Sequence, residues 1–350
     1  MQKNNRFLIY AAPLHFFCTF ARFFYKDNLT LNTMKKILVI GACGQIGSEL
    51  TPALRKQYGT DNVVAADMIY PLKGELAEAG PSCKIDATNA QDIADAVKKY
   101  NIDAIYNLAA ILSAKAEANP MLGWNVGVGA LINCLEVSRE MGCSLFTPSS
   151  IGAFGPDTPH DMTPQDTIQR PKTIYGVTKV TGELLSDYYF KRFGVDTRSV
   201  RFPGLISNVT LPGGGTTDYA VEIYYAAVKG EKFTCPIAKG TFMDMMYMPD
   251  ALKAAMDLME ADPSKLVHRN SFNITAMSFE PEMIYNEIKK HIPEFQMEYQ
   301  YDELRQSIAD SWPNQMDDHC AREEWGFKPM YDLASMTEDM LKVLGEKFRV

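Results

Sequence analysis

The sequence predicts an α/β protein with a doubly wound parallel sheet and a smaller C-terminal lobe. From Lys35 onward, short β-branched or apolar runs alternate with longer segments of helical periodicity, which is typical of parallel strands joined by crossover helices. A glycine-containing turn, from Gly41 to Gly47, separates the first apolar run from the first helical segment. With 46% hydrophobic and 22% charged residues, the composition is that of a globular chain with a sizeable core.

Five early strands can be placed in order along the chain, and helical stretches separate them. The predicted strands cover residues 36–40, 62–66, 83–85, 104–108 and 144–148, and the clearest helices between them cover 47–57 and 90–100. Two later apolar runs, 197–202 and 271–274, are candidates to extend the sheet. Helical periodicity returns at 221–228 and 281–291, in a region richer in Pro, Gly and Met that we expect to interleave with the late sheet elements.

Charge and cysteine content exclude several classes of function. The formal net charge is −8 and Lys and Arg form no cluster with aromatic residues, so a nucleic-acid partner is not expected. The seven cysteines are scattered and never spaced as C-x-x-C, which indicates neither a disulfide framework nor a metal site. Cys83, Cys134 and Cys143 lie in or beside segments that we interpret as buried, so we expect them to pack as small hydrophobic residues in a reducing compartment.

Residues 1–33 differ from the rest of the chain. They contain four Lys or Arg residues against a single acid, and their aromatic-rich stretch is interrupted by Pro13 and Arg22, which makes it too broken for a membrane span. Three interpretations remain open: an extension upstream of a working start at Met34, a transit peptide to the mitochondrial matrix, or a secretory signal. Without a targeting role the expected location is cytoplasmic. In each case we expect residues 1–33 to lie outside the fold, followed by a cofactor-binding domain at 34–205 and a substrate lobe at 206–350.

The turn at residues 41–47 reads Gly-Ala-Cys-Gly-Gln-Ile-Gly and lies between a strand and a helix. In a dinucleotide-binding loop the first glycine permits the tight turn, the middle one lets the backbone approach the pyrophosphate, and the last allows close helix–strand packing. Cys43 stands where the commoner G-x-G-x-x-G pattern has glycine. A tight turn without a ligand is the alternative, but the strand–loop–helix context favours a Rossmann-type dinucleotide site. Its contacts would come from Gly41, Gly44, Gln45, Ile46 and Gly47.

Asp67 ends the second predicted strand, where a carboxylate can accept hydrogen bonds from the adenosine ribose. Because it would repel a 2′-phosphate and no arginine stands beside it, the expected cofactor is NAD rather than NADP. Residues after the third and fourth strands would flank the adenine and the middle of the cofactor: Asp86, Ala87, Leu108, Ala109 and Ala110. An ordinary helix N-cap is the alternative role for Asp86.

Tyr175 and Lys179 form a Y-x-x-x-K pair, which a helix places on one face. A tyrosine has a pKa of about 10, so it is a poor base near neutral pH unless a cation stabilises its phenolate. Ser149 and Ser150 follow the fifth strand, upstream of the tyrosine. A solvated helix face and a loop hydroxyl pair are the alternatives for each motif alone. Together with the glycine loop, the motifs indicate hydride transfer to NAD, with Ser150 at the reacting oxygen and Tyr175 as the proton acceptor.

From Met34 to the C-terminus the chain resembles the extended short-chain dehydrogenases, the group that includes UDP-galactose 4-epimerase. Within that group, several strings are similar to the L-threonine 3-dehydrogenases. They are the glycine loop, Pro148-Ser-Ser-Ile-Gly-Ala-Phe-Gly155, Thr173-Ile-Tyr-Gly176, Arg201-Phe-Pro-Gly-Leu-Ile-Ser207, Pro212-Gly-Gly-Gly-Thr-Thr-Asp-Tyr-Ala220, Met245-Met-Tyr-Met248 and Ser311-Trp-Pro-Asn314.

The resemblance implies NAD-dependent oxidation of L-threonine at its 3-hydroxyl to 2-amino-3-oxobutanoate. It makes Tyr175 the base, Lys179 its electrostatic partner and ribose contact, and Ser150 the group that polarises the hydroxyl. Together with Ser150 and Tyr175, the residues that would line the amino-acid pocket are Ser113, Thr216 and Trp312, with a flexible approach at residues 213–215. A helix cap for Thr216 and a core position for Trp312 remain the alternatives. Related enzymes commonly pair through helices near the Y-x-x-x-K segment, so a homodimer is expected.

Two other functions remain open. A nucleotide-sugar epimerase or dehydratase shares the cofactor and the Ser-Tyr-Lys set, but it holds a diphosphate, which favours arginine. The chain has no arginine between residues 208 and 263, Phe154 stands where that group usually has tyrosine, and Pro203-Gly204 replaces its usual asparagine. A non-catalytic NAD-binding protein is the other possibility, because a fold alone does not determine function. The intact Ser-Tyr-Lys set argues against it.

Overall fold

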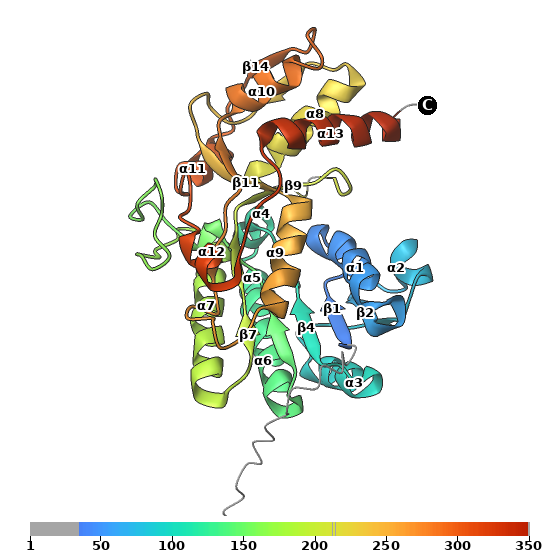
Figure 1. The fold of residues 1–350 in the computed structure, drawn as a ribbon. Helices are drawn as coiled ribbons and strands as arrows, with labels where there is room; N and C mark the ends of the chain where they lie inside the picture. Colours follow the sequence, from blue (N-terminus) through green and yellow to red (C-terminus); the bar gives the residue numbers. More distant parts are fainter. Residues whose placement is uncertain (1–34, 212, 214, 349–350) are drawn as a thin grey trace, which may run out of the picture. The chain divides into compact units, whose positions relative to one another are not determined.

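A six-stranded parallel sheet forms the centre of the structure, a computed structural model that describes residues 35–211, 213 and 215–348. Its strands are β1 (Ile37–Ile40), β2 (Val63–Asp67), β3 (Ser82–Lys84), β4 (Ala104–Asn107), β5 (Ser144–Phe146) and β7 (Thr197–Arg198). They pair in parallel in the order β3-β2-β1-β4-β5-β7 (Figure 1). The strand order therefore reverses between β1 and β4, the kind of position at which open α/β sheets bind ligands. The predicted fold class is confirmed.

Helices cover both faces of this sheet (Figure 1). The long ones are α1 (Gln45–Tyr58), α3 (Ala90–Tyr100), α6 (Ala130–Met141), α7 (Ile174–Phe193) and α9 (Met248–Glu260). Ile37 and Val39 of β1 pack into an apolar core with α1 and α9, whereas Leu38 and Ile40 pack into a second core with α3 and α6. This alternation follows from the two-residue period of a strand, and a strand buried on both faces is apolar at every position.

The predicted strand at 144–148 is shorter than expected. It stops at Phe146, because Pro148 has no N–H to donate to a neighbouring strand. The chain resumes as β6 (Ser149–Ser150), which pairs with β8 (Val200–Phe202) in a separate small sheet.

The prediction that 197–202 and 271–274 both extend the main sheet is correct only for β7. The first run divides at Ser199, whose backbone N–H donates to Arg269 and whose carbonyl accepts from Phe272 at 3.1 Å. These bonds draw the chain toward β12 (Phe272–Asn273), which pairs with β8 rather than with the main sheet. The two small strands and β6 therefore form a second, shorter parallel sheet.

A third apolar core fills the C-terminal lobe, which is formed mainly by α8 (Tyr219–Lys229), α10 (Pro281–Lys289) and α13 (Leu333–Phe348). The predicted helices at 221–228 and 281–291 correspond to α8 and α10. The lobe also contains β9 (Gly204–Ile206), β10 (Phe233–Cys235), β11 (Met243–Tyr247), β13 (Met277–Phe279) and β14 (Met297–Tyr299). Since α9 follows β11 but packs on the main sheet, the late chain contributes to both parts. The domain boundary after residue 205 stays a prediction.

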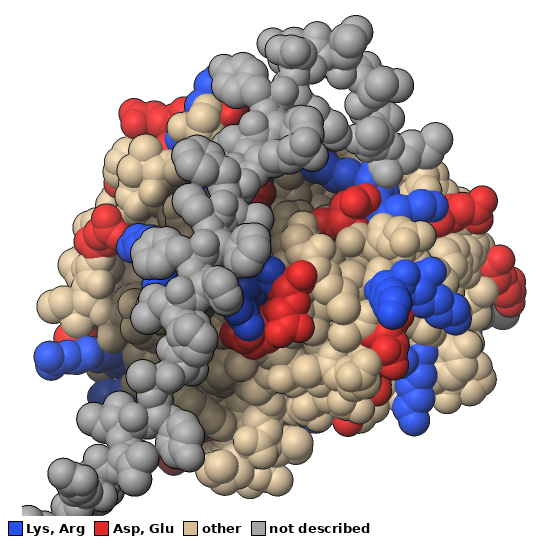
Figure 2. Space-filling view, turned by 90° about the horizontal axis from the view of Figure 1, so that it is seen from below, with Lys and Arg blue, Asp and Glu red and all other residues tan. Residues whose placement is uncertain are grey.

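Short helices complete the described chain: α2 (Glu75–Glu78), α4 (Ser113–Ala118), α5 (Pro120–Trp124), a π-helical segment (Asn125–Gly129), α11 (Glu303–Ala309), α12 (His319–Trp325), and single turns at Thr60–Asn62, Ile151–Ala153 and Thr216–Asp218. Residues 1–33 and the candidate start at Met34 lie outside the described residues. Within the described part of the chain, no helix is both long and apolar enough to cross a membrane. On the face seen in Figure 2, Lys and Arg lie interspersed with Asp and Glu.

Cys134 and Cys143 are buried in the core beneath α3 and α6, and Cys83 packs against the same core while half-buried. Burial raises the pKa of the Cys134 thiol to about 12 and that of Cys143 to about 11. Thiols with such pKa values stay protonated and behave as small apolar groups. This confirms the packing expected from the sequence.

Candidate active site

One cavity of about 580 Å³ runs from the carboxyl ends of β1, β2 and β4 to the C-terminal lobe. Every residue that the sequence assigned to a site lines it. From the cofactor set these are Gly41, Gly44, Gln45, Ile46, Gly47, Asp67, Asp86, Ala87, Leu108, Ala109 and Ala110. From the catalytic and substrate sets they are Ser113, Ser150, Tyr175, Lys179, Thr216 and Trp312. Gly214, in the flexible approach predicted at residues 213–215, lies outside the described residues.

Gly41 and Gly47 leave the space that the loop before α1 needs. Gly41 has a φ of 84°, which favours glycine, and a Cβ there would lie 2.9 Å from the carbonyl carbon of Leu108. A Cβ on Gly47 would lie 2.2 Å from the carbonyl oxygen of Gly41. Helix α1 begins after Gly44, without a side-chain cap and without an acid in its first turn. Its N-terminal N–H groups and positive dipole end are therefore available to an anion such as a pyrophosphate.

The Asp67 carboxylate is held at the end of β2 by backbone donors. One oxygen, Oδ2, accepts from Cys43 N at 2.9 Å, and Oδ1 accepts from Ile69 N, also at 2.9 Å. Each carboxylate oxygen has a second lone pair. The group is thus oriented at the cavity with capacity left for the hydroxyls of a ribose.

Asp86 also lines the cavity, and the alternative role as the N-cap of α3 is wrong. That cap is Asn89, whose side-chain oxygen accepts from Gln91 N at 3.1 Å. The Asp86 carboxylate instead accepts from the hydroxyl and the backbone N–H of Thr88 at 2.7 and 2.9 Å. These two bonds lower the pKa of the Asp86 carboxyl below its usual value.

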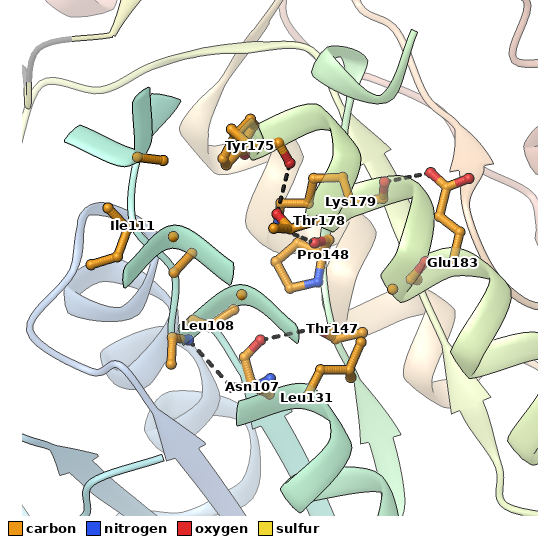
Figure 3. A pocket seen from close by; sticks show the side chains of 18 residues that line it. Asn107, Leu108, Ile111, Leu131, Thr147, Pro148, Tyr175, Thr178, Lys179 and Glu183 are labelled. Carbon is orange, nitrogen blue, oxygen red and sulfur yellow. Dashed lines mark hydrogen bonds between the residues drawn. The ribbon is translucent and has the colours of Figure 1, made fainter. Parts of the chain in front are cut away.

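Tyr175, Lys179 and Ser150 meet where α7 approaches β6. Helix α7 is capped by the Thr173 hydroxyl, which accepts from Gly176 N at 3.1 Å, so Tyr175 lies in the first helical turn. Lys179 Nζ lies 5.4 Å from the centre of the Tyr175 ring and donates to the carbonyl of Pro148 at 2.7 Å (Figure 3). The Ser150 hydroxyl oxygen accepts from Gly152 N at 3.1 Å. Its own hydrogen is therefore available to a group bound in the cavity.

Ser113 and Thr216 place two buried hydroxyls in the cavity wall, Ser113 at the start of α4 and Thr216 at the start of the turn before α8. Neither hydroxyl has a hydrogen-bond partner among the described residues. The N-cap of the Thr216 turn is Gly215, whose N–H donates to Asp218 Oδ2 at 2.6 Å, and the N-cap position of α8 is Asp218. The alternative that Thr216 caps a helix is therefore wrong.

Trp312 combines the two roles that the sequence left open. It packs against the small apolar cluster of Ile151, Phe154 and Met316, and it is half-buried, with part of its surface on the cavity. Its ring is thus supported by the core and covers one side of the site.

Sequence reasoning missed two charged residues of the cavity wall, Lys115 on α4 and Asp218 before α8. Each stands within two residues of a predicted pocket residue, Ser113 or Thr216, and that proximity was the available signal. Among the described residues, Lys115 and Lys179 are the cationic side chains of this cavity, and no arginine lines it.

A second, smaller cavity of about 30 Å³ lies behind the Tyr175–Lys179 face of α7. Figure 3 shows Tyr175, Lys179 and Glu183 following one another along this helix, with Pro148 beside Lys179 and Asn107 and Thr147 below. Polar side chains such as Asn107, Thr147 and Glu183 and apolar ones such as Leu108 and Leu131 therefore line this smaller cavity together.

His268, Cys320 and Glu324 form a group, outside both cavities, whose potential ligand atoms lie within 4.8 Å of one another. The Glu324 carboxylate already accepts from Val267 N at 2.6 Å and from His268 N at 3.0 Å, and it contacts the His268 ring. These bonds assign the carboxylate to fixing the loop before β12. That the protein needs no metal stays a prediction.

Comparison with known proteins gives consistent similarities. The model of the NAD dependent epimerase/dehydratase family matches residues 37–275. An uncharacterized epimerase/dehydratase of Staphylococcus haemolyticus is 55% identical over 314 residues, which cover 90% of this chain and 99% of the relative. The crystal structure of L-threonine dehydrogenase from Clostridium difficile matches with a TM-score of 0.88 and 58% identity, covering 90% of this chain and 98% of that one.

A UDP-glucose 4-epimerase of Thermotoga maritima, solved with UDP-glucose, also matches with a TM-score of 0.76 over 89% of this chain and 98% of that chain. Its sequence identity is 19%. This likeness concerns the fold alone.

Proposed function

Because the chain belongs to the NAD-dependent epimerase/dehydratase family, we propose that it is an oxidoreductase that converts L-threonine and NAD to 2-amino-3-oxobutanoate and NADH. The observation that carries this proposal is the 58% identity, over nearly the whole described chain, to a solved L-threonine dehydrogenase. Chains that share this much sequence generally share the residues of their sites. The remaining support comes from the chemistry of the cavity.

The residues around the glycine loop fit NAD. A side chain at Gly41 or Gly47 would collide with backbone, and the uncapped N-terminus of α1 suits the pyrophosphate. Asp67, already oriented by two backbone donors, would accept the ribose hydroxyls and repel a 2′-phosphate. When bound, NAD supplies the acceptor for the hydride that leaves C3 of the substrate.

In the proposed reaction Tyr175 takes the proton of the substrate 3-hydroxyl as hydride leaves C3, and the C–O bond becomes a carbonyl. Lys179 is held by the Pro148 carbonyl with its ammonium near the Tyr175 ring, where its charge stabilises the developing phenolate. Ser150 is oriented by Gly152 N, so its hydrogen can be donated to the reacting oxygen. Tyr175 and Ser150 thus act on the substrate oxygen directly, whereas Lys179 acts through the Tyr175 phenolate.

The wall toward the lobe suits a small zwitterion with one hydroxyl. Ser113 and Thr216 offer hydroxyls without partners among the described residues, Trp312 supplies an apolar surface, and Lys115 and Asp218 add one charge of each sign. A compact ligand of this kind needs a few convergent polar groups rather than a charged fork. A nucleotide-sugar diphosphate would lack an arginine partner among the described lining residues.

The alternative, a nucleotide-sugar epimerase or dehydratase, is favoured by the name of the family model and of the bacterial relatives. It shares NAD and the Ser-Tyr-Lys set, so those residues do not discriminate between the two functions. The substrate end of the cavity does.

Purified protein mixed with NAD and L-threonine, followed at the NADH absorbance, tests the proposal. We expect turnover with L-threonine, none with NADP at equal concentration, and no conversion of UDP-glucose or UDP-galactose in parallel reactions followed by chromatography. Sugar-nucleotide conversion without threonine oxidation would establish the alternative instead. NAD binding without turnover of either substrate class would point to a non-catalytic NAD-binding protein.

A further inference from the structure

A buried polar group stands directly behind the proposed catalytic residues. Its centre is Glu183 on α7, which accepts hydrogen bonds from Ser149 of β6, Arg201 of β8 and Gln169. Arg201 donates twice, from Nε to Oε1 at 2.9 Å and from Nη2 to Oε2 at 2.8 Å, and Gln169 donates to Oε2 at 2.7 Å. The Ser149 hydroxyl donates to Oε1. We call these four residues the Glu183 network.

The network connects the two elements that hold the reacting groups. Tyr175, Lys179 and Glu183 lie at successive turns of one face of α7 (Figure 3). Opposite them, residues 148–150 are held one by one: Lys179 donates to the Pro148 carbonyl, Glu183 accepts from the Ser149 hydroxyl, and Ser150 pairs in register with Phe202 of β8.

Arg201 connects Ser149 and Glu183 by a second route. Its backbone pairs in register with Ser149, while its guanidinium binds the same Glu183 carboxylate that Ser149 contacts. Its Nη1 continues to the Gln165 carbonyl at 2.8 Å and to Asn273 Oδ1 at 2.9 Å. Glu183 and Arg201 are both almost fully buried. Separating such a buried pair is costly, because it leaves an uncompensated charge away from water.

We infer that Glu183, acting through Ser149, is a positioning residue that sets the distance between Ser150 on β6 and Tyr175 on α7. The inference rests on the proposed function, in which both hydroxyls must reach one substrate oxygen. Groups of a catalytic set must be held within about 0.5 Å of the productive geometry, and misplacement by about 1 Å can cost about 10² in rate. Among the described residues, the Ser149 hydroxyl is the side-chain hydrogen bond that joins Glu183 to β6, the strand that contains Ser150.

The test variant is Ser149→Ala, which cuts this link and leaves the Glu183–Arg201 pair intact. We expect kcat to fall about tenfold or more, with KM for L-threonine and the Kd of NAD within a few-fold of wild type and Tm lower by no more than a few degrees. Because no charge is altered, the pH midpoint of kcat should not move. The matched control is Ser186→Ala, one turn beyond Glu183 on the same helix, whose buried hydroxyl has no partner among the described residues.

Wild-type kcat in Ser149→Ala would overturn the inference, and so would an equal loss in Ser186→Ala, which would mean a general loss of packing in α7. A shift in the pH midpoint would also overturn it, because the network would then act on the charge of Tyr175 or Lys179 instead of on distance. Glu183→Gln, which keeps an acceptor for Ser149 but removes the charge opposite Arg201, should lower Tm more than Ser149→Ala does.

A crystal structure of Ser149→Ala with NAD separates this inference from the proposed function, since it needs no substrate. Displacement or multiple positions of Ser150 relative to Tyr175 support positioning even if L-threonine proves not to be the substrate. An undisturbed Ser150 overturns it even if threonine is oxidised by the wild-type protein.

Discussion

Tyr175 lies in the first turn of α7 with its ring packed beside Gly152, where a Cβ would come within 3.2 Å of the ring. Its hydroxyl has no hydrogen-bond partner among the described residues. Tyr175→Phe should therefore keep the packing and the Kd of NAD within a few-fold but lower kcat by about 10² or more, because only the proton acceptor is lost. Initial rates at saturating L-threonine and NAD titrations measure this, with Tyr188→Phe on the exposed side of α7 as the control. Unchanged turnover would exclude Tyr175 as the base.

Asp67 is predicted to determine the choice between NAD and NADP. Asp67→Ser removes both the ribose acceptor and the negative charge, so it should raise the KM for NAD and increase the NADP-to-NAD ratio of kcat/KM. Asp67→Asn removes the charge but keeps one acceptor oxygen in place of two. Comparing it with Asp67→Ser separates the effect of charge repulsion from that of the hydrogen bonds to the ribose. The measurement is kcat/KM with each cofactor. A wild-type preference for NADP would contradict this interpretation of the carboxylate.

Thr216 is predicted to bind the substrate at the end of the cavity near the C-terminal lobe. Thr216→Ala removes one buried hydroxyl and should raise the KM for L-threonine by about tenfold, as expected for one lost hydrogen bond to a charged group, without changing the Kd of NAD. Steady-state kinetics with Thr234→Ala, an exposed threonine on β10, as the control provide the comparison. If threonine kinetics were indifferent to combined changes at Ser113, Thr216 and Trp312, the pocket would have to lie elsewhere.

The elements that the sequence predicted best are those with strong local signals. Helix α3 begins and ends where expected, since Asn89 caps its start and Asn101, in a left-handed conformation, ends it. The small sheet of β6, β8 and β12 was not predicted, because it depends on bonds between Ser199 and residues far along the chain. Apolar periodicity shows that a run is buried but not which strand it pairs with.

The residues of the candidate site also fall into those with a local sequence signal and those that only folding brings together. The glycine loop, Asp67 and the Y-x-x-x-K pair were found because each is a local pattern whose chemistry requires its spacing. The Glu183 network was missed because its partners come from separate elements and meet only through folding. Nothing in the local sequence distinguishes Glu183 or Arg201 from a solvated charge.

Strand β11 contains a buried acid, Asp244, whose oxygens accept from the Thr275 hydroxyl at 2.5 Å and from Met316 N at 2.7 Å. Burial raises the pKa of its carboxyl to about 8, and the nearby Asp318 adds to the rise. A folded-state pKa above the unfolded value, about 3.9, means that the native state binds the proton more tightly. The stability associated with that proton is complete below about pH 4 and is lost as pH rises toward 8.

Asp244→Asn imitates the protonated acid, because its amide can donate to Thr275 and its oxygen can accept from Met316. Between pH 5 and 8 the free energy of unfolding of wild type should therefore fall relative to that of this variant, by up to about 1.4 kcal/mol per pH unit. Urea unfolding at several pH values measures the difference, with the exposed Asp166→Asn as control. A difference that stays constant across this range would mean that Asp244 does not titrate there.

The assembled chain leaves an apolar face on α7 that bears on the expected homodimer. Val177, Leu184 and Tyr188 are exposed and recur at spacings that place them on one side of the helix, away from the Tyr175–Lys179 face. Exposed apolar side chains on one side of a helix are the kind of surface at which chains associate, and in a two-fold dimer the same face of each copy would meet. We therefore predict a dimer in sedimentation velocity, with twice the mass of one chain.

Leu184→Glu should shift this dimer to monomer, because the new carboxylate would face its own copy near the two-fold axis. Leu304→Glu, on α11 with a similar exposed fraction, 58% against 63% for Leu184, should leave the dimer intact. A monomeric wild type, or a dimer that survives Leu184→Glu, would rule out α7 as the interface, whereas loss of the dimer in Leu304→Glu would move the interface to α11.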